Sequence, residues 1–312
     1  MSHWTAFDIP SQSGRTAVVT GTGGLGFEDA LALARAGANL VLAGRSPAKG
    51  AAAVDRIRRR VPDANVRFGV LDLASLDSIE AFGDALRGSL GSLDLLINNA
   101  GVMTPPKRQV TADGFELQFG TNYLGHFALT ARLLPLLRMG DRPRVVTLSS
   151  IAARQGAIHF GDLQSERSYK PMAAYSQSKL ACLMFALELQ RRSDTAGWGI
   201  QSIAAHPGIS RTDLIPNGSG TWSAAGMLRR FLWFLFQSPA QGALPTLFAA
   251  TSPQAQGGAY YGPDKFSEVR GHPTVAAIPP RALDTNGAAR LWTESERLAG
   301  VAFPSGKEQE SR

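Results

Sequence analysis

The chain has 312 residues, of which 44% are apolar and 18% charged, a composition typical of an ordinary soluble globular protein. That length suits one large α/β domain or two small ones. The single cysteine, Cys182, excludes a disulfide framework and a cysteine-based metal site, and it favours a reducing, cytoplasmic location. Residues 1–13 have neither a basic start nor a long apolar run, so no signal peptide is expected.

The net charge is +7 and the pI is about 9.9. Such a balance suits nucleic acid, an acidic membrane surface or a polyanionic cofactor. The densest basic run, 56–60, is short and falls on a predicted helix end, and basic residues with interleaved aromatics do not recur. We therefore expect no nucleic-acid partner. Five scattered histidines without carboxylates at ligand spacing predict no metal site.

The chain opens with an irregular arm over residues 1–14, and we expect a single domain over residues 15–312. A β-rich run, 16–20, leads into a glycine turn and an apolar-periodic helix that ends at Gly37; the next strand is 40–43. This unit is typical of dinucleotide binding, because glycines let backbone N–H groups approach the pyrophosphate at a helix N-terminus. The turn residues predicted to bind the cofactor are Gly21, Thr22, Gly24, Leu25 and Gly26.

The residue after the second strand indicates which dinucleotide binds. An acidic residue there binds the ribose 2′-hydroxyl of NAD, but this chain has Gly44 followed by Arg45. An arginine suits a 2′-phosphate. We therefore predict NADP(H) rather than NAD(H) as the cofactor.

Strand and helix patterns continue to alternate. Further strands are predicted at 66–71, 93–97, 144–148 and 200–205, and helices at 76–86, at 111–137 and around Tyr175. The alternation predicts a single doubly wound parallel sheet, the Rossmann fold, with helices on both faces. Ligands of such sheets bind beyond the carboxyl ends of the strands. The residues that follow predicted strands are the glycine turn, Arg45, Asp72, Asn98-Asn99, Ser150 and Pro207-Gly208.

Tyr175 and Lys179 stand four residues apart in a segment with a helical apolar pattern. Positions i and i+4 lie on one face of a helix, so the phenol and the ammonium are aimed at the same place. A free tyrosine has a pKa of about 10. A positive charge about 4 Å away, at an effective dielectric near 20, is worth about 4 kcal/mol, or roughly three pKa units. The pair therefore predicts a general acid/base that works near neutral pH.

Together these motifs resemble the short-chain dehydrogenase/reductase family, and within it the branch of retinol dehydrogenases and WW-domain oxidoreductases. The resemblance covers about residues 15–300, and the segment from Phe160 to Tyr169 is similar to an insert of that branch. It implies hydride transfer between a nicotinamide cofactor and a carbonyl or alcohol. The matching motifs are Thr20-Gly21…Gly26, Asp72, Asn98-Asn99-Ala100-Gly101, Asn122, Ser150, Tyr175-x-x-x-Lys179 and Pro207-Gly208…Thr212.

The resemblance also implies a role for each matching residue. Tyr175 exchanges a proton with the substrate oxygen, and Ser150 binds that oxygen. Lys179 holds the nicotinamide ribose and lowers the pKa of the tyrosine, while Asn122 fixes a water in a proton relay behind the lysine. The implied cofactor contacts come from Asp72 and Leu73 near the adenine, from Asn99, Ala100 and Gly101 along the adenosine side, and from Pro207, Gly208, Ile209 and Thr212 at the nicotinamide end.

The glycine turn departs from the family pattern Thr-Gly-x-x-x-Gly-x-Gly. Here the turn from Gly21 to Gly26 is one residue shorter and fits the Gly-x-Gly-x-x-Gly spacing instead. The glycines and the helix N-terminus remain, so pyrophosphate binding is still expected. The contacts to the adenosine phosphate stay open, and a reduced cofactor affinity is one expectation.

An aromatic-rich stretch over about 210–237 follows the Pro207-Gly208 turn. We interpret it as a lid over a lipophilic substrate, and with Arg229 and Arg230 it leaves contact with a membrane surface open. Packing on the sheet or on another subunit is the alternative, so a homo-oligomer also stays open. We interpret His126 and His206 as residues that orient the structure near the site.

Two rival functions stay open. Residues 121–127 are similar to a segment of light-driven protochlorophyllide reductases, but the cysteine that follows the Pro-Gly turn in that family is absent, because Ile209 and Ser210 stand there. The second rival is an NADP-binding sensor or scaffold that has lost turnover. The intact set of Ser150, Tyr175 and Lys179 argues against it.

Overall fold

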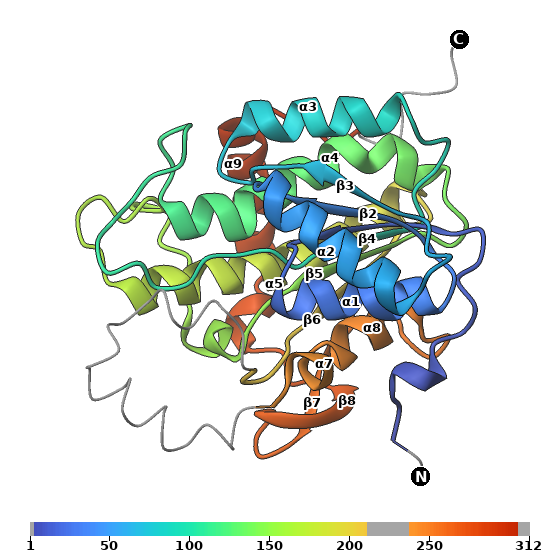
Figure 1. Cartoon of the computed structure of the whole chain (residues 1–312). Coiled ribbons are helices and arrows are strands. Elements are labelled where there is room, and N and C mark those ends of the chain that lie inside the picture. The colour runs from blue at the N-terminus through green and yellow to red at the C-terminus, as the bar shows by residue number, and fades with distance from the viewer. Residues whose placement is uncertain (1–2, 211–236, 305–312) are drawn as a thin grey trace.

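A computed structural model describes residues 3–210 and 237–304. Its centre is an eight-stranded sheet in the order β3-β2-β1-β4-β5-β6-β7-β8 (Figure 1). β1 to β7 pair in parallel and β8 is antiparallel to β7, so the predicted doubly wound Rossmann sheet is confirmed, with an added antiparallel edge. The strands are β1 (Thr16–Thr20), β2 (Asn39–Gly44), β3 (Val66–Val70), β4 (Leu95–Asn98), β5 (Arg144–Leu148), β6 (Gln201–Ala205), β7 (Tyr260–Lys265) and β8 (Arg270–Val275).

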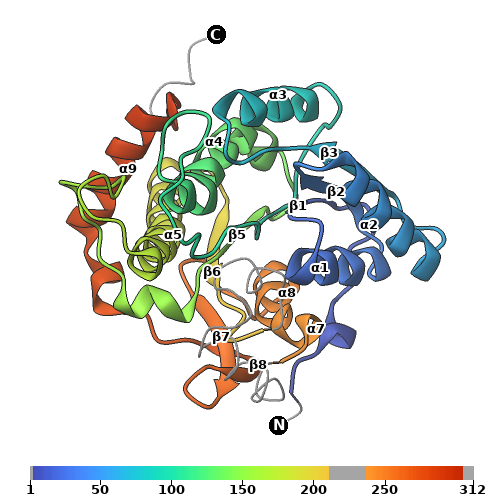
Figure 2. The same ribbon diagram turned by 60° about the vertical axis from the view of Figure 1, so that its left-hand side comes forward.

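Helices cover both faces of the sheet, as Figure 2 shows. One face carries α1 (Gly24–Arg35), α2 (Pro47–Arg60), α7 (Pro239–Gly242) and α8 (Leu244–Thr251), and the other carries α3 (Leu76–Arg87), α4 (Gly125–Arg138), α5 (Pro171–Ala196) and α9 (Thr285–Ala299). Shorter turns are η1 (Ala6–Asp8), the π-helical η2 (Phe119–Leu124), η3 (Ile151–Gln155) and η5 (Pro280–Leu283). Among the described helices, none has the length and apolar character needed to cross a bilayer.

Two apolar clusters sandwich the sheet. Val18 of β1 belongs to the cluster under α3, α4, α5 and α9, while its neighbours Ala17 and Val19 belong to the cluster under α1, α2 and α8. Side chains alternate between the faces of a strand, so a parallel strand covered on both faces must be apolar throughout. The carboxyl ends of the buried parallel strands therefore lie side by side at one end of the sheet, where the predicted site residues follow them.

The predicted helix over 111–137 is wrong in its first six residues. Val110 and Glu116 instead form an isolated bridge, and Thr111 donates its N–H to the carbonyl of Phe115. The turn between them contains Gly114 at a φ of +85°, a left-handed conformation that glycine adopts without steric cost. Helical structure starts only at residue 117 and passes through η2 into α4.

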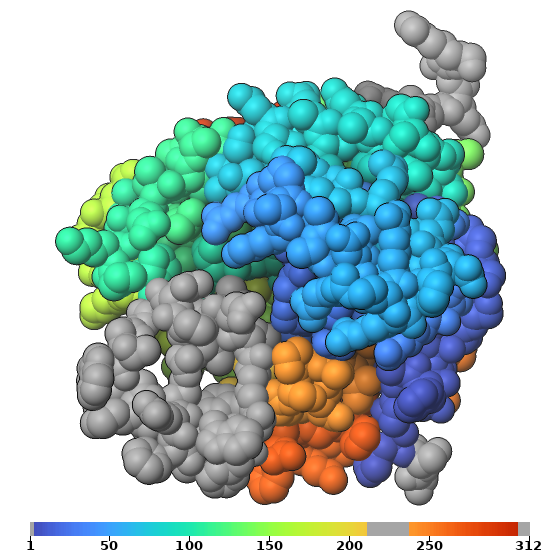
Figure 3. Space-filling model, viewed as in Figure 1, coloured from blue at the N-terminus to red at the C-terminus, as the bar shows by residue number. Residues whose placement is uncertain are grey.

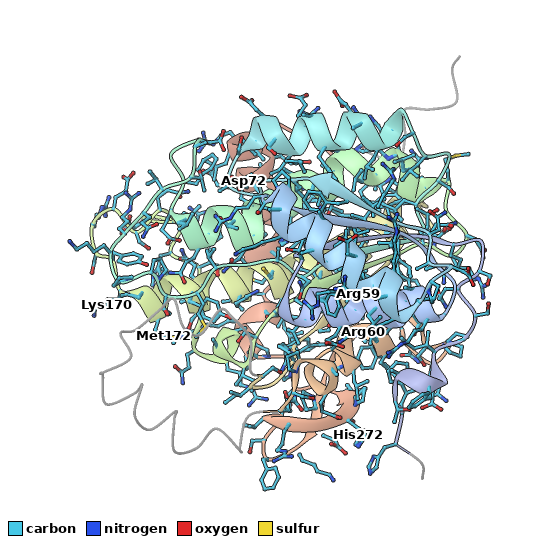
Figure 4. The ribbon with its side chains drawn as sticks, in the orientation of Figure 1. Arg59, Arg60, Asp72, Lys170, Met172 and His272 are labelled. Carbon is cyan, nitrogen blue, oxygen red and sulfur yellow. The ribbon has the colours of Figure 1, made fainter. Side chains whose placement is uncertain are left out.

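The N-terminal arm is described from residue 3, and its residues His3 and Trp4 pack near the antiparallel edge. The ring of His3 stacks on that of His272 on β8 at 4.2 Å, and Trp4 meets Phe248 of α8 edge-on at 5.4 Å. Figure 4 shows where His272 lies. In the space-filling view the blue N-terminal part lies directly against the orange segment that carries α7, α8 and the β7–β8 hairpin (Figure 3). The domain limits drawn from the sequence stay a prediction.

Candidate active site

A cavity of about 230 Å³ opens at the carboxyl ends of β1, β2 and β4. Its walls come from the glycine turn, from the segments after β2 and β3, and from the segment after β4. Seven of the predicted cofactor residues line this one cavity, namely Gly21, Thr22, Arg45, Asp72, Leu73, Ala100 and Gly101. Residues from four separate strand ends therefore meet where the sequence predicts an adenosine site.

Gly26, at the end of the glycine turn, has no room for a side chain. A Cβ on Gly26 would lie 2.5 Å from the carbonyl oxygen of Gly21 and 2.5 Å from Nδ2 of Asn99. Asn99 donates that Nδ2 to the carbonyl of Thr20 at 2.7 Å, so its amide holds the turn. Although the turn is one residue shorter than the family pattern, α1 still begins at Gly24. Its N-cap, Gly23, supplies no side-chain cap. The N–H groups of the first turn thus lack a side-chain acceptor and suit a pyrophosphate.

Two cationic residues line the cavity. Arg45 follows β2, and Lys49 lies in the first turn of α2, whose N-cap is Ser46. Asp72 accepts the N–H of Ala74 at 3.0 Å just past β3, beside α3 (Figure 4). Sequence reasoning missed Lys49. The Ser46-Pro47 helix start was the available signal, because it places Lys49 four residues after Arg45 near a helix N-terminus.

α5 brings Tyr175 and Lys179 to the carboxyl end of β5. Tyr175 is 8% and Lys179 6% exposed, and Nζ of the lysine lies 6.0 Å from the centre of the phenol ring. Nζ donates to the carbonyl of Leu148 at 3.0 Å, and Oγ of Ser149 donates to the carbonyl of Lys179 at 2.7 Å. The end of β5 thus fixes the helix from two sides. Ser150 comes next, and its Oγ caps η3 by accepting the N–H of Ala152 at 3.2 Å.

Asn122 is held from all sides. Its Nδ2 donates to the carbonyl of Val102 and to Oγ of Ser178, both at 3.0 Å, and its Oδ1 accepts the N–H of Val102 at 2.7 Å. Its main-chain oxygen accepts from Nδ1 of His126 at 2.9 Å and from Sγ of Cys182 at 3.2 Å. Both lone pairs of that carbonyl are engaged, so a water bound there must displace one donor. The proton relay through Asn122 stays a prediction.

His126 connects Asn122 to Thr20, the residue before the glycine turn. Nδ1 faces a carbonyl and must carry the ring proton, which leaves Nε2 to accept from the hydroxyl of Thr20 at 2.9 Å. The same hydroxyl oxygen accepts the N–H groups of Asn99 and Ala100 at 2.9 and 3.0 Å. Burial lowers the pKa of His126 to about 4, so the ring is neutral near pH 7.

The remaining predicted residues follow β6. Pro207, Gly208 and Ile209 form the turn after this strand, with Gly208 at a φ of +63°. Thr212 lies outside the described residues, and so does most of the predicted lid at 210–237, of which only Ser210 and Gln237 are described. Within residues 3–210 and 237–304, no three His, Cys, Asp or Glu side chains group as metal ligands.

Asp29 is a buried carboxyl on the helix that starts at the glycine turn. It is fully buried, and neither of its oxygens has a hydrogen-bond partner among the described residues. Desolvation raises the pKa of this carboxyl well above its usual value, and Glu28 adds to the effect. Because the folded-state pKa exceeds the unfolded one, stability falls as the pH rises from the ordinary carboxyl pKa toward the raised one.

We expect Asp29→Thr to raise the free energy of unfolding at pH 7 by about 1–3 kcal/mol, because it removes a buried polar group without a partner. The threonine hydroxyl can bond to a carbonyl of its own helix. The gain should shrink as the pH falls, since protonation already relieves the wild type. Urea unfolding at pH 7 and pH 5 measures both effects, with Asp55→Thr on the exposed side of α2 as control. A gain that does not change with pH contradicts this account.

Comparison with known proteins decides the family. The family model described as short chain dehydrogenase matches residues 15–219. The chain belongs to the short-chain dehydrogenase family. It is 41% identical to human retinol dehydrogenase 13 over 302 residues, covering 95% of this chain and 88% of that protein. It is 40% identical to mouse polyprenol dehydrogenase over 301 residues, covering 94% and 86%.

Solved structures agree with this assignment. A crystal structure of an uncharacterized protein from Mycobacterium paratuberculosis superposes with a TM-score of 0.80 at 40% identity, covering 97% of this chain and all of the other. L-Sorbose reductase from Gluconobacter frateurii shares the fold at 22% identity, with a TM-score of 0.65 and coverage of 81% and 95%. The resemblance to the retinol-dehydrogenase-like branch is confirmed. The protein is therefore an oxidoreductase of a family that uses nicotinamide cofactors.

Proposed function

We propose that this short-chain dehydrogenase transfers hydride between NADP(H) and the carbonyl or alcohol carbon of a hydrophobic small molecule, with Tyr175 as general acid/base. The observation that carries the proposal is the place of Tyr175 and Lys179 at the end of β5, where Lys179 bonds to Leu148. Ser150 follows the same strand end as the N-cap of η3. A Cβ built on Gly101, in the cavity wall, would lie 3.8 Å from Nζ of Lys179. A dinucleotide seated on the glycine turn thus extends from the cavity toward the lysine and the phenol.

Lys179, Tyr175 and Ser150 have separate roles in this proposed reaction. The ammonium of Lys179 has three N–H groups and uses one on Leu148, which leaves two for ribose hydroxyls. The phenol of Tyr175 exchanges a proton with the substrate oxygen. Ser150 orients that oxygen. The nicotinamide, when bound, supplies or accepts the hydride.

The names of the relatives support a lipophilic substrate. Retinol and polyprenol are both long apolar alcohols, and proteins named for them are about 40% identical to almost the whole of this chain. Binding such a molecule requires apolar surface around a few oriented polar groups. We therefore propose an isoprenoid-like alcohol or its aldehyde as substrate.

The proposal is tested by following NADPH absorbance in the dark with retinal, a polyprenal and short-chain aldehydes. We expect oxidation of NADPH with kcat/KM highest for the long apolar aldehydes. Tight NADPH binding without oxidation across the panel would indicate a sensor instead. A requirement for light would indicate the protochlorophyllide-type reaction.

The cofactor preference follows from Arg45 and Lys49. We expect Arg45→Asp combined with Lys49→Glu to lower the ratio of kcat/KM for NADPH to that for NADH about a hundredfold or more, since charged hydrogen bonds to phosphate contribute about 1.5–3 kcal/mol each. The control is Arg59→Asp. Arg59 lies at the other end of α2 from Lys49 and outside the cavity (Figure 4). An unchanged ratio would show that these cations do not read the 2′-phosphate.

A further inference from the structure

Three charged or polar side chains from distant segments meet at the carboxyl end of β6. Nε2 of His206 lies 2.9 Å from Oε2 of Glu268, and Nη2 of Arg154 lies 2.6 Å from the same oxygen. Oε1 of Glu268 accepts the N–H of Ala277 at 3.0 Å. His206 is 0% exposed, while Glu268 sits in the turn between β7 and β8 and Arg154 sits in η3, four residues after Ser150. Sequence reasoning gave no role to Arg154 or Glu268.

The hydrogen bonds of His206 determine its tautomer. Nδ1 accepts the N–H of Gly208 at 3.2 Å and so cannot carry a proton. The ring proton is therefore on Nε2, where the carboxylate of Glu268 accepts it. A carboxylate opposite one ring nitrogen is a common way to select a histidine tautomer and to fix its ring. Glu268 thus keeps Nδ1 of His206 free to accept the N–H of Gly208. The imidazole ring also packs against the ring of Tyr260, with 5.0 Å between the ring centres.

Only a carboxylate fits the position of Glu268. Its two oxygens accept from three donors, which are the imidazole N–H, the guanidinium and the amide of Ala277. A glutamine has one acceptor oxygen and an NH2 group. If its oxygen faces His206 and Arg154, its NH2 faces the amide of Ala277. If its oxygen faces Ala277, its NH2 faces the guanidinium and favours the wrong tautomer of His206.

The turn that carries Glu268 is shaped to hold the segment after β6. Phe266, Ser267 and Glu268 have φ values of +53°, +54° and +68°, a left-handed run that is strained for residues other than glycine. The next residue, Val269, accepts the N–H of Ile209 at 2.9 Å. A Cβ on Gly208 would lie 2.2 Å from that same carbonyl oxygen. The hairpin therefore closes directly on Gly208 and Ile209.

We propose that Glu268 is a positioning residue for the nicotinamide end of the cofactor. It acts through His206 and the hairpin turn on the main chain of Pro207–Ile209, and through Arg154 on the segment that follows Ser150. The inference rests on the proposed NADP(H)-dependent function. The adenosine cavity lies at β1, β2 and β4 and the phenol lies at β5, so the next strand end, β6, adjoins the reacting end of the dinucleotide.

The test is Glu268→Gln in the full chain. We expect NADPH to bind about ten- to thirtyfold more weakly by fluorescence titration, because the buried imidazole N–H of His206 loses its acceptor. Adenosine 2′,5′-bisphosphate, the adenosine half of NADPH, should bind as it does to the wild type. The matched control is Glu294→Gln on α9, which also leaves an arginine, Arg297, without its carboxylate. Equal weakening of both ligands, or of neither, would overturn the inference.

Two further variants separate tautomer control from a general loss of packing. In His206→Asn, the amide oxygen can take the place of Nδ1 and accept from Gly208, so NADPH affinity should stay within about threefold of the wild type. His206→Leu lacks that acceptor, so its NADPH affinity should fall as it does in Glu268→Gln. It provides the test if Glu268→Gln fails to fold. Adding Glu268→Gln to His206→Asn should weaken NADPH binding less than Glu268→Gln does in the wild type, because only the contribution through Arg154 is then lost. Similar losses in the Asn and Leu variants would contradict the proposal.

The outcome for the wild type distinguishes this inference from the function on which it rests. If the wild type neither binds nor oxidises NADPH, the proposed function fails and the inference with it. If the wild type does both, and Glu268→Gln binds NADPH as tightly, the inference alone fails.

Discussion

Replacing Tyr175 with phenylalanine is expected to lower kcat by about 10²–10⁴-fold, the usual contribution of a positioned acid or base. The phenol is 8% exposed on α5, and β5 fixes that helix through Leu148 and Ser149. Removing one oxygen from this side chain leaves its ring packing in place. NADPH affinity should therefore change little, since the lysine and the glycine turn remain, and the loss should appear in kcat.

The measurement is steady-state NADPH oxidation together with direct titration of NADPH binding. Tyr261→Phe on β7 is the control, because its hydroxyl bonds to the N–H of Gln256 on the other side of the sheet. It should keep wild-type kcat. Turnover by Tyr175→Phe at the parent's speed would show that another group moves the proton.

Gly26→Ala is expected to abolish measurable NADPH binding. The added methyl would lie 2.5 Å from the carbonyl oxygen of Gly21, which is backbone and cannot rotate away, and 2.5 Å from Nδ2 of Asn99. Relief requires α1 to move away from the turn. That movement displaces the first-turn N–H groups that suit the pyrophosphate and breaks the bond from Asn99 to Thr20.

Fluorescence titration with NADPH measures this loss, and circular dichroism checks that the variant still folds. The control is Gly91→Ala, at an exposed position where a Cβ meets no atom within 4 Å. It should bind NADPH like the wild type. A Gly26→Ala variant with wild-type affinity would show that the turn adapts and that its glycines are not needed for close approach.

Much of the site could be predicted from the sequence because its signals are local. The glycine turn, Arg45 and the Tyr175–Lys179 pair each depend on spacing within one strand–helix unit, and such spacing sets backbone geometry directly. The parallel sheet followed from alternation of strand and helix patterns. Parallel strands align their carboxyl ends, so residues after six predicted strands could be assigned to one edge before any contact was known.

Other features depend on contacts between distant parts of the chain. The hydrogen-bonded partners His206 and Glu268 are 62 residues apart in the sequence. Arg154 also donates to the carbonyl of Ser267, which is 113 residues away. Their meeting depends on how the antiparallel hairpin closes over β6, and no local pattern encodes that docking. The hydrogen bonds to the main-chain carbonyl of Asn122 also depend on distant contacts, since Sγ of Cys182 donates to it from another helix.

The sequence by itself determined the order of the elements, the glycine turn and the helical spacing of Tyr175 and Lys179, because these follow from hydrophobic periodicity and from residues a few positions apart. Only the tertiary structure decided the tautomers of His126 and His206, the orphaned carboxyl of Asp29 and the three donors around Glu268. A histidine's proton and a buried acid's pKa depend on whatever atoms lie within about 4 Å, and in a folded chain those atoms come from segments far away in the sequence.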